Sequence, residues 1–243
     1  MFEWEKFSKS RGIGVWIDEA LEILEPDYWR FALIEMRPEL RDSNFTWREF
    51  YRIVNSDMND DIGNFIHRIL MFVYKNYDST VPAPSRMEEP DLEFKEKVAS
   101  ACRSVEENLD ECRYKLALEN IVGIAREGNH YINLKKPWEA LARKDGSADT
   151  TMWIGVNVVK ALAVLLSPIT PNASRRIWEN LGLEGDVLEY PWRRAGEMDI
   201  QPGHKIRSPP KPLFNKLPEN FIDNVQSIID EARRKVLRPA VLA

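Results

Sequence analysis

Apolar residues recur every three or four positions through most of this chain, and that spacing predicts α-helices. The clearest apolar face follows Asn59 and consists of Ile62, Phe65, Ile66, Ile69, Leu70, Phe72 and Val73. Comparable patterns predict further helices at residues 91–111, 114–134, 150–166, 172–181 and 218–236. The sequence therefore predicts a mainly α protein built around a helical bundle.

The first 55 residues are patterned differently from the rest. Glycine alternates with apolar residues from Gly12 to Ile17, which favours a strand, and Thr46 with Glu49 has the spacing of a helix capping box. We therefore expect a small mixed α/β unit at residues 1–56 and a helical bundle at residues 57–200. Residues 201–243 are expected to hold a proline-rich extended segment and a terminal helix.

Composition narrows the possible functions. With 243 residues, 44% hydrophobic and 30% charged, the chain is long enough to bury a core. The net charge of −5 argues against electrostatic binding of nucleic acid along the whole chain, so any RNA contact must be local. Binding to DNA is not expected. The longest apolar run, residues 161–166, is far too short to span a membrane, and the first residues are too charged for a signal peptide. We expect a cytoplasmic protein without membrane contact.

A basic stretch near the start is the first candidate site. Lys6 and Lys9 alternate with Ser8 and Ser10 in a loop-like segment. Lysine ammonium groups on a loop can stabilise phosphate charge, and small serines let the backbone approach it. A solvated basic N-terminus is the alternative interpretation.

Two helical segments carry the second candidate site. Asn64 and Arg68 are four residues apart, so an amide and a guanidinium share one helix face and could read the edge of an unpaired RNA base. Trp138 follows Pro137, and its indole could stack on such a base. Surface polarity and a tryptophan packed into the bundle are the alternatives.

Basic residues around that tryptophan could bind the RNA backbone. They are Lys135, Lys136, Arg143 and Lys144. Their positive charge would offset the acidic average of the chain locally. No metal site is expected, because His67 has no second ligand four residues away and the two cysteines, Cys102 and Cys112, form no zinc knuckle.

Several ordered fragments together resemble the C-terminal half of the methionyl-tRNA synthetases of archaeal type. In chain order they are Lys6-Phe7-Ser8-Lys9-Ser10-Arg11-Gly12, Arg37-Pro38-Glu39 together with Arg41-Asp42, Phe45-Thr46-Trp47, Asn59-Asp60-Asp61-Ile62-Gly63-Asn64, Lys136-Pro137-Trp138 and Gly203-His204-Lys205. The resemblance runs from the first residues to about Lys216, and six fragments in order are far more specific than any one.

The resemblance implies a class I ATP-dependent ligase that joins methionine to tRNA(Met) through an adenylate. The signature loop, residues 6–10, would lie on the ATP side, with Phe7 replacing the commoner methionine of that motif. The small fold after it would pack beside the inner side of the tRNA. Asn64, Arg68 and Trp138 would read the CAU anticodon, chiefly its cytosine, and Pro137 would hold the tryptophan.

Parts of that family pattern are missing from this chain. The histidines, His67, His130 and His204, do not stand in the strand-to-helix setting of the family's nucleotide-binding signature, and two distant cysteines cannot supply the family's zinc site. No complete set of catalytic residues is therefore expected, and the chain alone is predicted to be inactive and free of zinc. Its partners would be tRNA(Met) and a missing N-terminal catalytic domain. A naturally split synthetase and a helical interaction protein without an RNA role remain alternatives.

Overall fold

The computed structural model describes residues 1–243 except residues 9, 40–41, 208, 211 and 238–243. Its elements are α1 (Ile17–Ile23), α2 (Pro26–Glu35), α3 (Trp47–Arg52), η1 (Ile53–Gly63), α4 (Asn64–Asn76), α5 (Glu89–Asp110), α6 (Tyr114–Lys135), α7 (Pro137–Arg143), α8 (Ser147–Leu166), α9 (Pro171–Asn180), η2 (Val187–Glu189), η3 (Trp192–Arg194) and α10 (Phe221–Leu237). The mainly α fold is confirmed, and the described residues form isolated β-bridges instead of strands.

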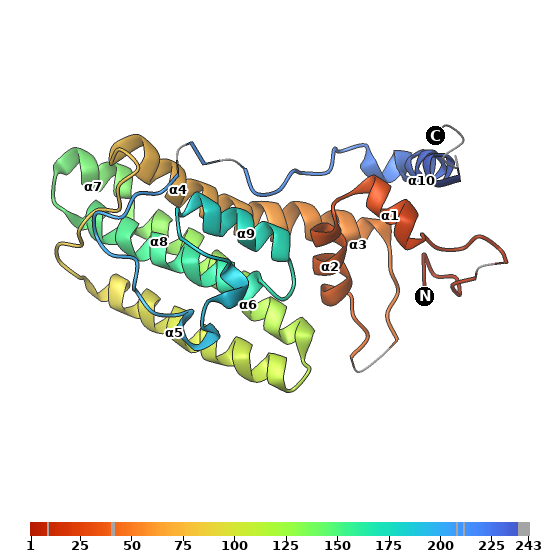
Figure 1. The fold of residues 1–243 in the computed structure, drawn as a ribbon, viewed down its shortest axis with the longest axis horizontal. Helices are drawn as coiled ribbons and strands as arrows, with labels where there is room; N and C mark the ends of the chain where they lie inside the picture. The colour runs from red at the N-terminus through yellow and green to blue at the C-terminus, as the bar shows by residue number, and fades with distance from the viewer. Residues whose placement is uncertain (9, 40–41, 208, 211, 238–243) are drawn as a thin grey trace.

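The bundle is arranged around α8 (Figure 1). Helices α5 and α6 form a long antiparallel pair, and α4, α6, α7 and α9 also pack against α8. Helix α8 is long and apolar enough to cross a membrane by length and composition, but 89% of its most apolar window is buried inside the protein. It is therefore the central helix of the core.

Two glycines bring α4 close to its neighbours. A Cβ added at Gly128 on α6 would lie 2.4 Å from the ring of Phe65, and one added at Gly155 on α8 would lie 2.2 Å from Ile69. Bare backbone at these positions lets the two apolar side chains of α4 sit against α6 and α8. The same contacts fix the register of the polar residues next to Phe65.

Helices α3, η1 and α4 form one continuous helical run from Trp47 to Asn76. The predicted cap is confirmed, because the Glu49 amide donates to the Thr46 hydroxyl at 3.2 Å. The middle of the run, η1, is a π-helix. Its last turn is closed by a hydrogen bond from the backbone N–H of Asn64 to the backbone carbonyl of Asn59. The expected division between residues 56 and 57 thus falls inside a helix.

The strand expected at residues 12–17 is wrong. Gly12 and Gly14 have positive φ angles of 67° and 130°, so the backbone turns there, and helix α1 begins at Ile17. Alternation of glycine with apolar residues reflects a turn in this case, because glycine is the residue that adopts such angles without strain.

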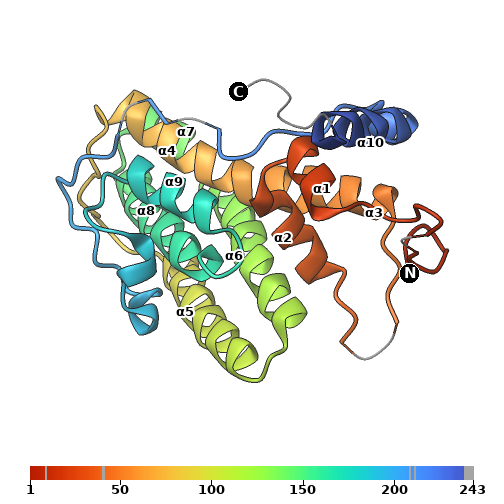
Figure 2. The ribbon, with the colours of Figure 1, turned by 45° about the vertical axis from the view of Figure 1, so that its right-hand side comes forward.

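The C-terminal segment returns along the bundle to the N-terminal end (Figures 1 and 2). On its way the Val81 amide donates to the His204 carbonyl at 2.8 Å, and the Ile206 amide donates to the Ser79 carbonyl at 2.9 Å. Helix α10 then packs against α1 and α3. Residues 1–56, called here the N-terminal unit, therefore contact both the bundle and the last helix.

Candidate nucleic-acid interface

Helices α4 and α6 place four polar side chains in a ladder. Asn64 and Arg68 lie one turn apart on α4, and Asn129 and Asn133 lie one turn apart on α6. Arg68 donates to the Asn129 side-chain oxygen at 3.3 Å and to the Asn133 side-chain oxygen at 2.7 Å, while Asn64 donates to Asn129 at 3.3 Å. The structure therefore brings the predicted pair together and adds two asparagines.

The ladder is anchored to the π-helix. Asn129 donates through its amide nitrogen to the Asp61 carbonyl at 2.9 Å. Arg126, one turn before Asn129, forms ion pairs with Asp57 at 2.8 Å and with Asp61 at 2.7 Å. These contacts fix α6 against η1, so the polar ladder rests on a rigid support.

Among the described residues, the guanidinium of Arg68 donates hydrogen bonds only to neutral side-chain oxygens. Its acceptors are side-chain amides, and burial lowers the pKa of its guanidinium. An arginine nevertheless stays charged at any ordinary pH. A half-buried guanidinium without a carboxylate partner favours an anion or the electronegative edge of a base.

Trp138 faces the same hollow as Arg68. Lys136 ends α6 in the left-handed conformation (φ 43°), and Pro137 begins α7 at the buried first helical position. This sharp turn leaves the indole of Trp138 47% exposed, so it is not the packed anchor of the alternative interpretation. A hollow of about 230 Å³, called here the Arg68–Trp138 hollow, is lined by Arg68, Met71, Phe72, Lys75, Asn76, Ile132, Pro137, Trp138 and Met152.

One predicted backbone contact is wrong. The side chain of Lys135 is only 4% exposed, and its ammonium is paired with Glu88 at 2.5 Å and with Asp91 at 3.0 Å. Asp91 is itself fully buried and also accepts a 2.6 Å hydrogen bond from the Tyr131 hydroxyl. Lys135 therefore neutralises an internal carboxylate and presents no free charge to a phosphate.

The other basic residues of this end are at the surface. Lys136 pairs with Glu139 at 3.3 Å, and Arg143 pairs with Asp145 at 2.9 Å and more loosely with Glu139. Lys144 is exposed in a left-handed conformation. Exposed pairs of this kind are weak, so their cations can exchange a carboxylate for a phosphate.

Sequence reasoning missed several residues of this site. Asn129 and Asn133 share the four-residue spacing of Asn64 and Arg68, and this signal could have found them. Lys75 lies on the rim of the hollow and is exposed. Its position about two helical turns beyond Arg68 gives no reason to prefer it over other surface lysines.

The signature loop lies at the opposite end of the molecule from α7 (Figure 1). Lys6 is exposed, and Ser8 and Ile13 exchange two backbone hydrogen bonds of 3.1 and 2.9 Å that close the loop. The Ser8 and Ser10 hydroxyls are 3.4 Å apart. Lys9 lies outside the described residues.

The two cysteines do not fit the zinc site of the methionyl-tRNA synthetases that the sequence resembles. Cys102 is buried, and burial raises the pKa of its thiol to about 11. Cys112 is exposed on the turn between α5 and α6.

Comparisons with known proteins agree with this geometry. Residues 1–70 match the family model described as "tRNA synthetases class I (M)", and residues 81–233 match the model described as "Anticodon binding domain of methionyl tRNA ligase". The chain is 46% identical to the methionine–tRNA ligase of Aeropyrum pernix over 100% of its own length and 42% of that protein. It is 43% identical to the methionine–tRNA ligase of Thermofilum pendens, with coverage of 96% and 40%.

A solved structure supports the same assignment. The methionyl-tRNA synthetase of Mycobacterium tuberculosis bound by methionyl-adenylate matches with a TM-score of 0.79 and 26% identity, over 86% of this chain and 42% of that one. The chain thus spans about two fifths of the length of the relatives it matches. From these matches and its helical fold, the chain belongs to the methionyl-tRNA ligase family and carries that family's anticodon-binding domain.

Proposed function

We propose that this chain is the C-terminal, tRNA-binding part of an ATP-dependent methionine–tRNA ligase of the cytoplasm. In this proposal the Arg68–Trp138 hollow reads the cytosine of the CAU anticodon of tRNA(Met). The observation that carries it is the position of a half-buried guanidinium, held by neutral amides, beside the same hollow as an exposed indole.

The chemistry of the hollow suits cytosine better than uracil. Trp138 offers a flat surface on which any base can stack. Arg68 presents only donors, which match the ring nitrogen and the carbonyl oxygen of cytosine, and the side-chain oxygens of Asn64 and Asn133 can accept from the exocyclic amine. Uracil carries an N–H where cytosine has a ring acceptor, so a donor would face the guanidinium. The hollow therefore discriminates against uracil because the N–H of that base would be left without an acceptor.

Backbone charge should set the salt dependence of binding. Lys136, Arg143 and Lys144 surround α7, and each phosphate contact that they make would release counterions. We predict that Lys144→Gln lowers affinity for all anticodon stem-loops alike and reduces the salt slope by about 1. Dissociation constants measured across a salt series by fluorescence anisotropy check this.

The matched control for that measurement is Lys235→Gln on α10, at the other end of the molecule (Figure 1). Its salt slope should equal that of the wild type. If stem-loops bind with no salt dependence, the RNA role is wrong, and the helical interaction protein becomes the better description.

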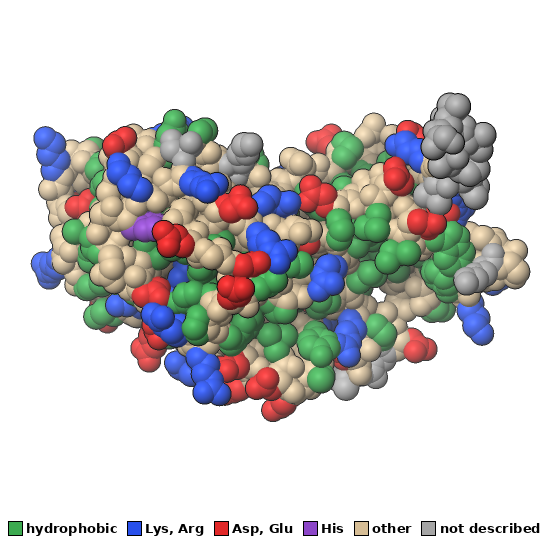
Figure 3. All heavy atoms as spheres, in the orientation of Figure 1, with side chains coloured by type: hydrophobic (Ala, Val, Ile, Leu, Met, Phe, Trp, Pro, Cys, Tyr) green, Lys and Arg blue, Asp and Glu red, His purple; other side chains and the backbone are tan. Residues whose placement is uncertain are grey.

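The N-terminal unit has the surface expected for contact with a further domain. Hydrophobic side chains gather at this end of the face drawn in Figure 3. An apolar hollow of about 600 Å³ lies here, and Ile17, Phe7 and Leu21 on its lining are 78%, 50% and 48% exposed. Exposed apolar surface of this extent is typical of an interface. We infer that the N-terminal catalytic domain of the parent enzyme packs on it.

Complementation tests this partner. The chain alone should give no methionine-dependent ATP–pyrophosphate exchange, because Lys6, Ser8, Lys9 and Ser10 supply only the ATP-side loop. Adding the separately produced N-terminal part of a relative should restore exchange, and Ile17→Asp should prevent this because a carboxylate is buried in the contact. Exchange by the isolated chain would contradict the assignment of catalysis to the missing domain.

A further inference from the structure

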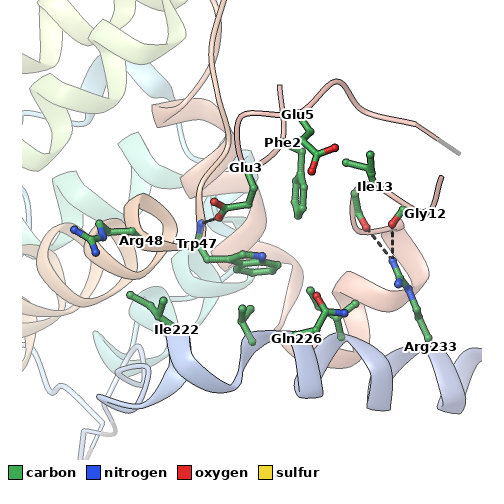
Figure 4. Close-up of a pocket in the computed structure, with 13 residues that line it drawn as sticks. Phe2, Glu3, Glu5, Gly12, Ile13, Trp47, Arg48, Ile222, Gln226 and Arg233 are labelled. Atoms are coloured by element: carbon green, nitrogen blue, oxygen red, sulfur yellow. Dashed lines mark hydrogen bonds between the residues drawn. The ribbon is translucent and has the colours of Figure 1, made fainter.

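Helix α10 and the N-terminal segment enclose a hollow of about 530 Å³ (Figure 4). Its floor is apolar, where Ile222, Val225 and Ile229 of α10 lie near Trp47 and Phe2. At the far end of the helix the contact becomes polar, and Figure 4 shows Arg233 reaching from α10 to the backbone around Gly12. The apolar part accounts for the docking of α10, but it does not account for this arginine.

Arg233 makes one ion pair and two backbone contacts. Its Nε donates to Glu19 at 2.8 Å, and its Nη2 donates to the Gly14 carbonyl at 3.0 Å and to the Gly12 carbonyl at 3.5 Å. The side chain of Glu19 is only 6% exposed, and its second oxygen accepts from the Trp16 amide at 3.1 Å. A single guanidinium on α10 thus holds the chain from Gly12 to Glu19.

The segment that Arg233 holds is the base of the signature loop. Ile13, between the two glycines, exchanges both closing hydrogen bonds with Ser8. Phe7 packs on Gly14, where an added Cβ would lie 2.3 Å from its ring. A two-bond closure of this kind is marginal alone and needs support from packing. Gly12 and Gly14 both have positive φ angles, so the backbone on either side of Ile13 has glycine's wide freedom unless it is held.

We propose that α10 is a positioning element for the signature loop and that Arg233 is its positioning residue. By fixing the carbonyls of Gly12 and Gly14, Arg233 keeps Ile13 in register with Ser8 and so sets where Lys6, Ser8 and Ser10 lie. Without it, Glu19 keeps a buried carboxylate without its ion-pair partner, and the loop base regains the freedom of its glycines. The proposal rests on the ATP-side role of the loop given under the proposed function, and it adds a residue far from the loop in sequence.

Amide hydrogen exchange tests the contact in the chain itself. Arg233→Ala should speed exchange at Ser8 and Ile13 by about tenfold or more, because hydrogen bonds to charged groups are among the stronger ones. Arg233→Lys keeps the charge and should restore part of the protection. The matched control is Arg234→Ala, whose exposed side chain donates only to the Asp230 carbonyl of its own helix and should leave both amides unchanged.

The bundle supplies an internal reference for that measurement. Amides of α5 and α6 should exchange at the wild-type rate in Arg233→Ala. Equal protection of Ser8 and Ile13 in wild type and variant would overturn the proposal. Faster exchange throughout the bundle would also overturn it, because the arginine would then stabilise the whole chain and not the loop.

The complementation assay supplies the catalytic readout. With the N-terminal part added, Arg233→Ala should lower kcat for ATP–pyrophosphate exchange about tenfold, leave KM for methionine unchanged and leave stem-loop affinity unchanged. An unchanged kcat would contradict the positioning role. Absence of activity in the wild-type mixture would count against the proposed function instead, and the exchange result at Ser8 and Ile13 would still decide whether Arg233 holds the loop.

Discussion

Replacing Trp138 with alanine is expected to weaken binding of a CAU anticodon stem-loop by about 1 to 3 kcal/mol, which is about 5- to 150-fold in the dissociation constant. The exposed indole forms one wall of the Arg68–Trp138 hollow, and alanine removes the surface on which a base can stack. Fluorescence anisotropy with a labelled stem-loop measures the loss. The thermal unfolding temperature should change little, because the indole is half exposed.

Two further variants distinguish this role from others. Trp4→Ala removes a tryptophan that is 74% exposed on the N-terminal unit and should leave anticodon affinity unchanged. Arg68→Lys keeps the positive charge but loses the planar fork, so it should lose affinity for the cognate loop nearly as Arg68→Ala does. If Arg68→Lys binds as the wild type does, Arg68 contacts a phosphate and does not read a base. If Trp138→Ala unfolds the chain without altering affinity, the tryptophan is a packing residue.

Replacing Lys135 with alanine is expected to destabilise the fold by about 3 to 5 kcal/mol. The variant leaves the fully buried carboxylate of Asp91 without its cation, and the remaining hydrogen bonds from the Tyr131 hydroxyl and the Glu88 backbone amide do not neutralise it. Urea unfolding followed by circular dichroism measures the free energy of unfolding. The neighbouring variant Lys136→Ala, at an exposed position, should lie within about 0.5 kcal/mol of the wild type.

A double variant shows whether the unpaired charge is the cause. Lys135→Met combined with Asp91→Asn keeps an acceptor for Tyr131 and removes the buried charge, so it should recover much of the lost stability. A Lys135→Ala protein with wild-type stability and a reduced salt slope for RNA binding would mean that the ammonium lies at the surface. That result would reinstate the backbone contact predicted from sequence.

The sequence predicted those elements whose signals are local. The helices at residues 91–111 and 114–134 were expected from apolar spacing, and α5 and α6 occupy nearly those bounds. The Thr46 cap needed only residues within one turn. The ion pair of Lys135 depended instead on Asp91, 44 residues away and on another helix, so no local pattern distinguished Lys135 from exposed Lys136.

The same distinction holds within the candidate site. Spacing on one helix was enough to pair Asn64 with Arg68, and the break before Pro137 was enough to place Trp138 after a turn. Helices α4 and α7 line one hollow because both pack against α8. No local sequence pattern predicts that packing. The turn at Gly12 and Gly14 has the same alternation of glycine and apolar residues as a strand, and alternation alone does not reveal positive φ angles.

The most direct measurement of the central claim is a titration of this chain with two anticodon stem-loops that differ only at the first anticodon base, cytosine or uracil. The hollow is expected to bind the cytosine form at least tenfold more tightly at the same salt concentration, because uracil turns an N–H towards the guanidinium of Arg68. Arg68→Ala should abolish most of that difference. Equal affinity for the two stem-loops in the wild type would contradict the claim that this hollow reads the anticodon.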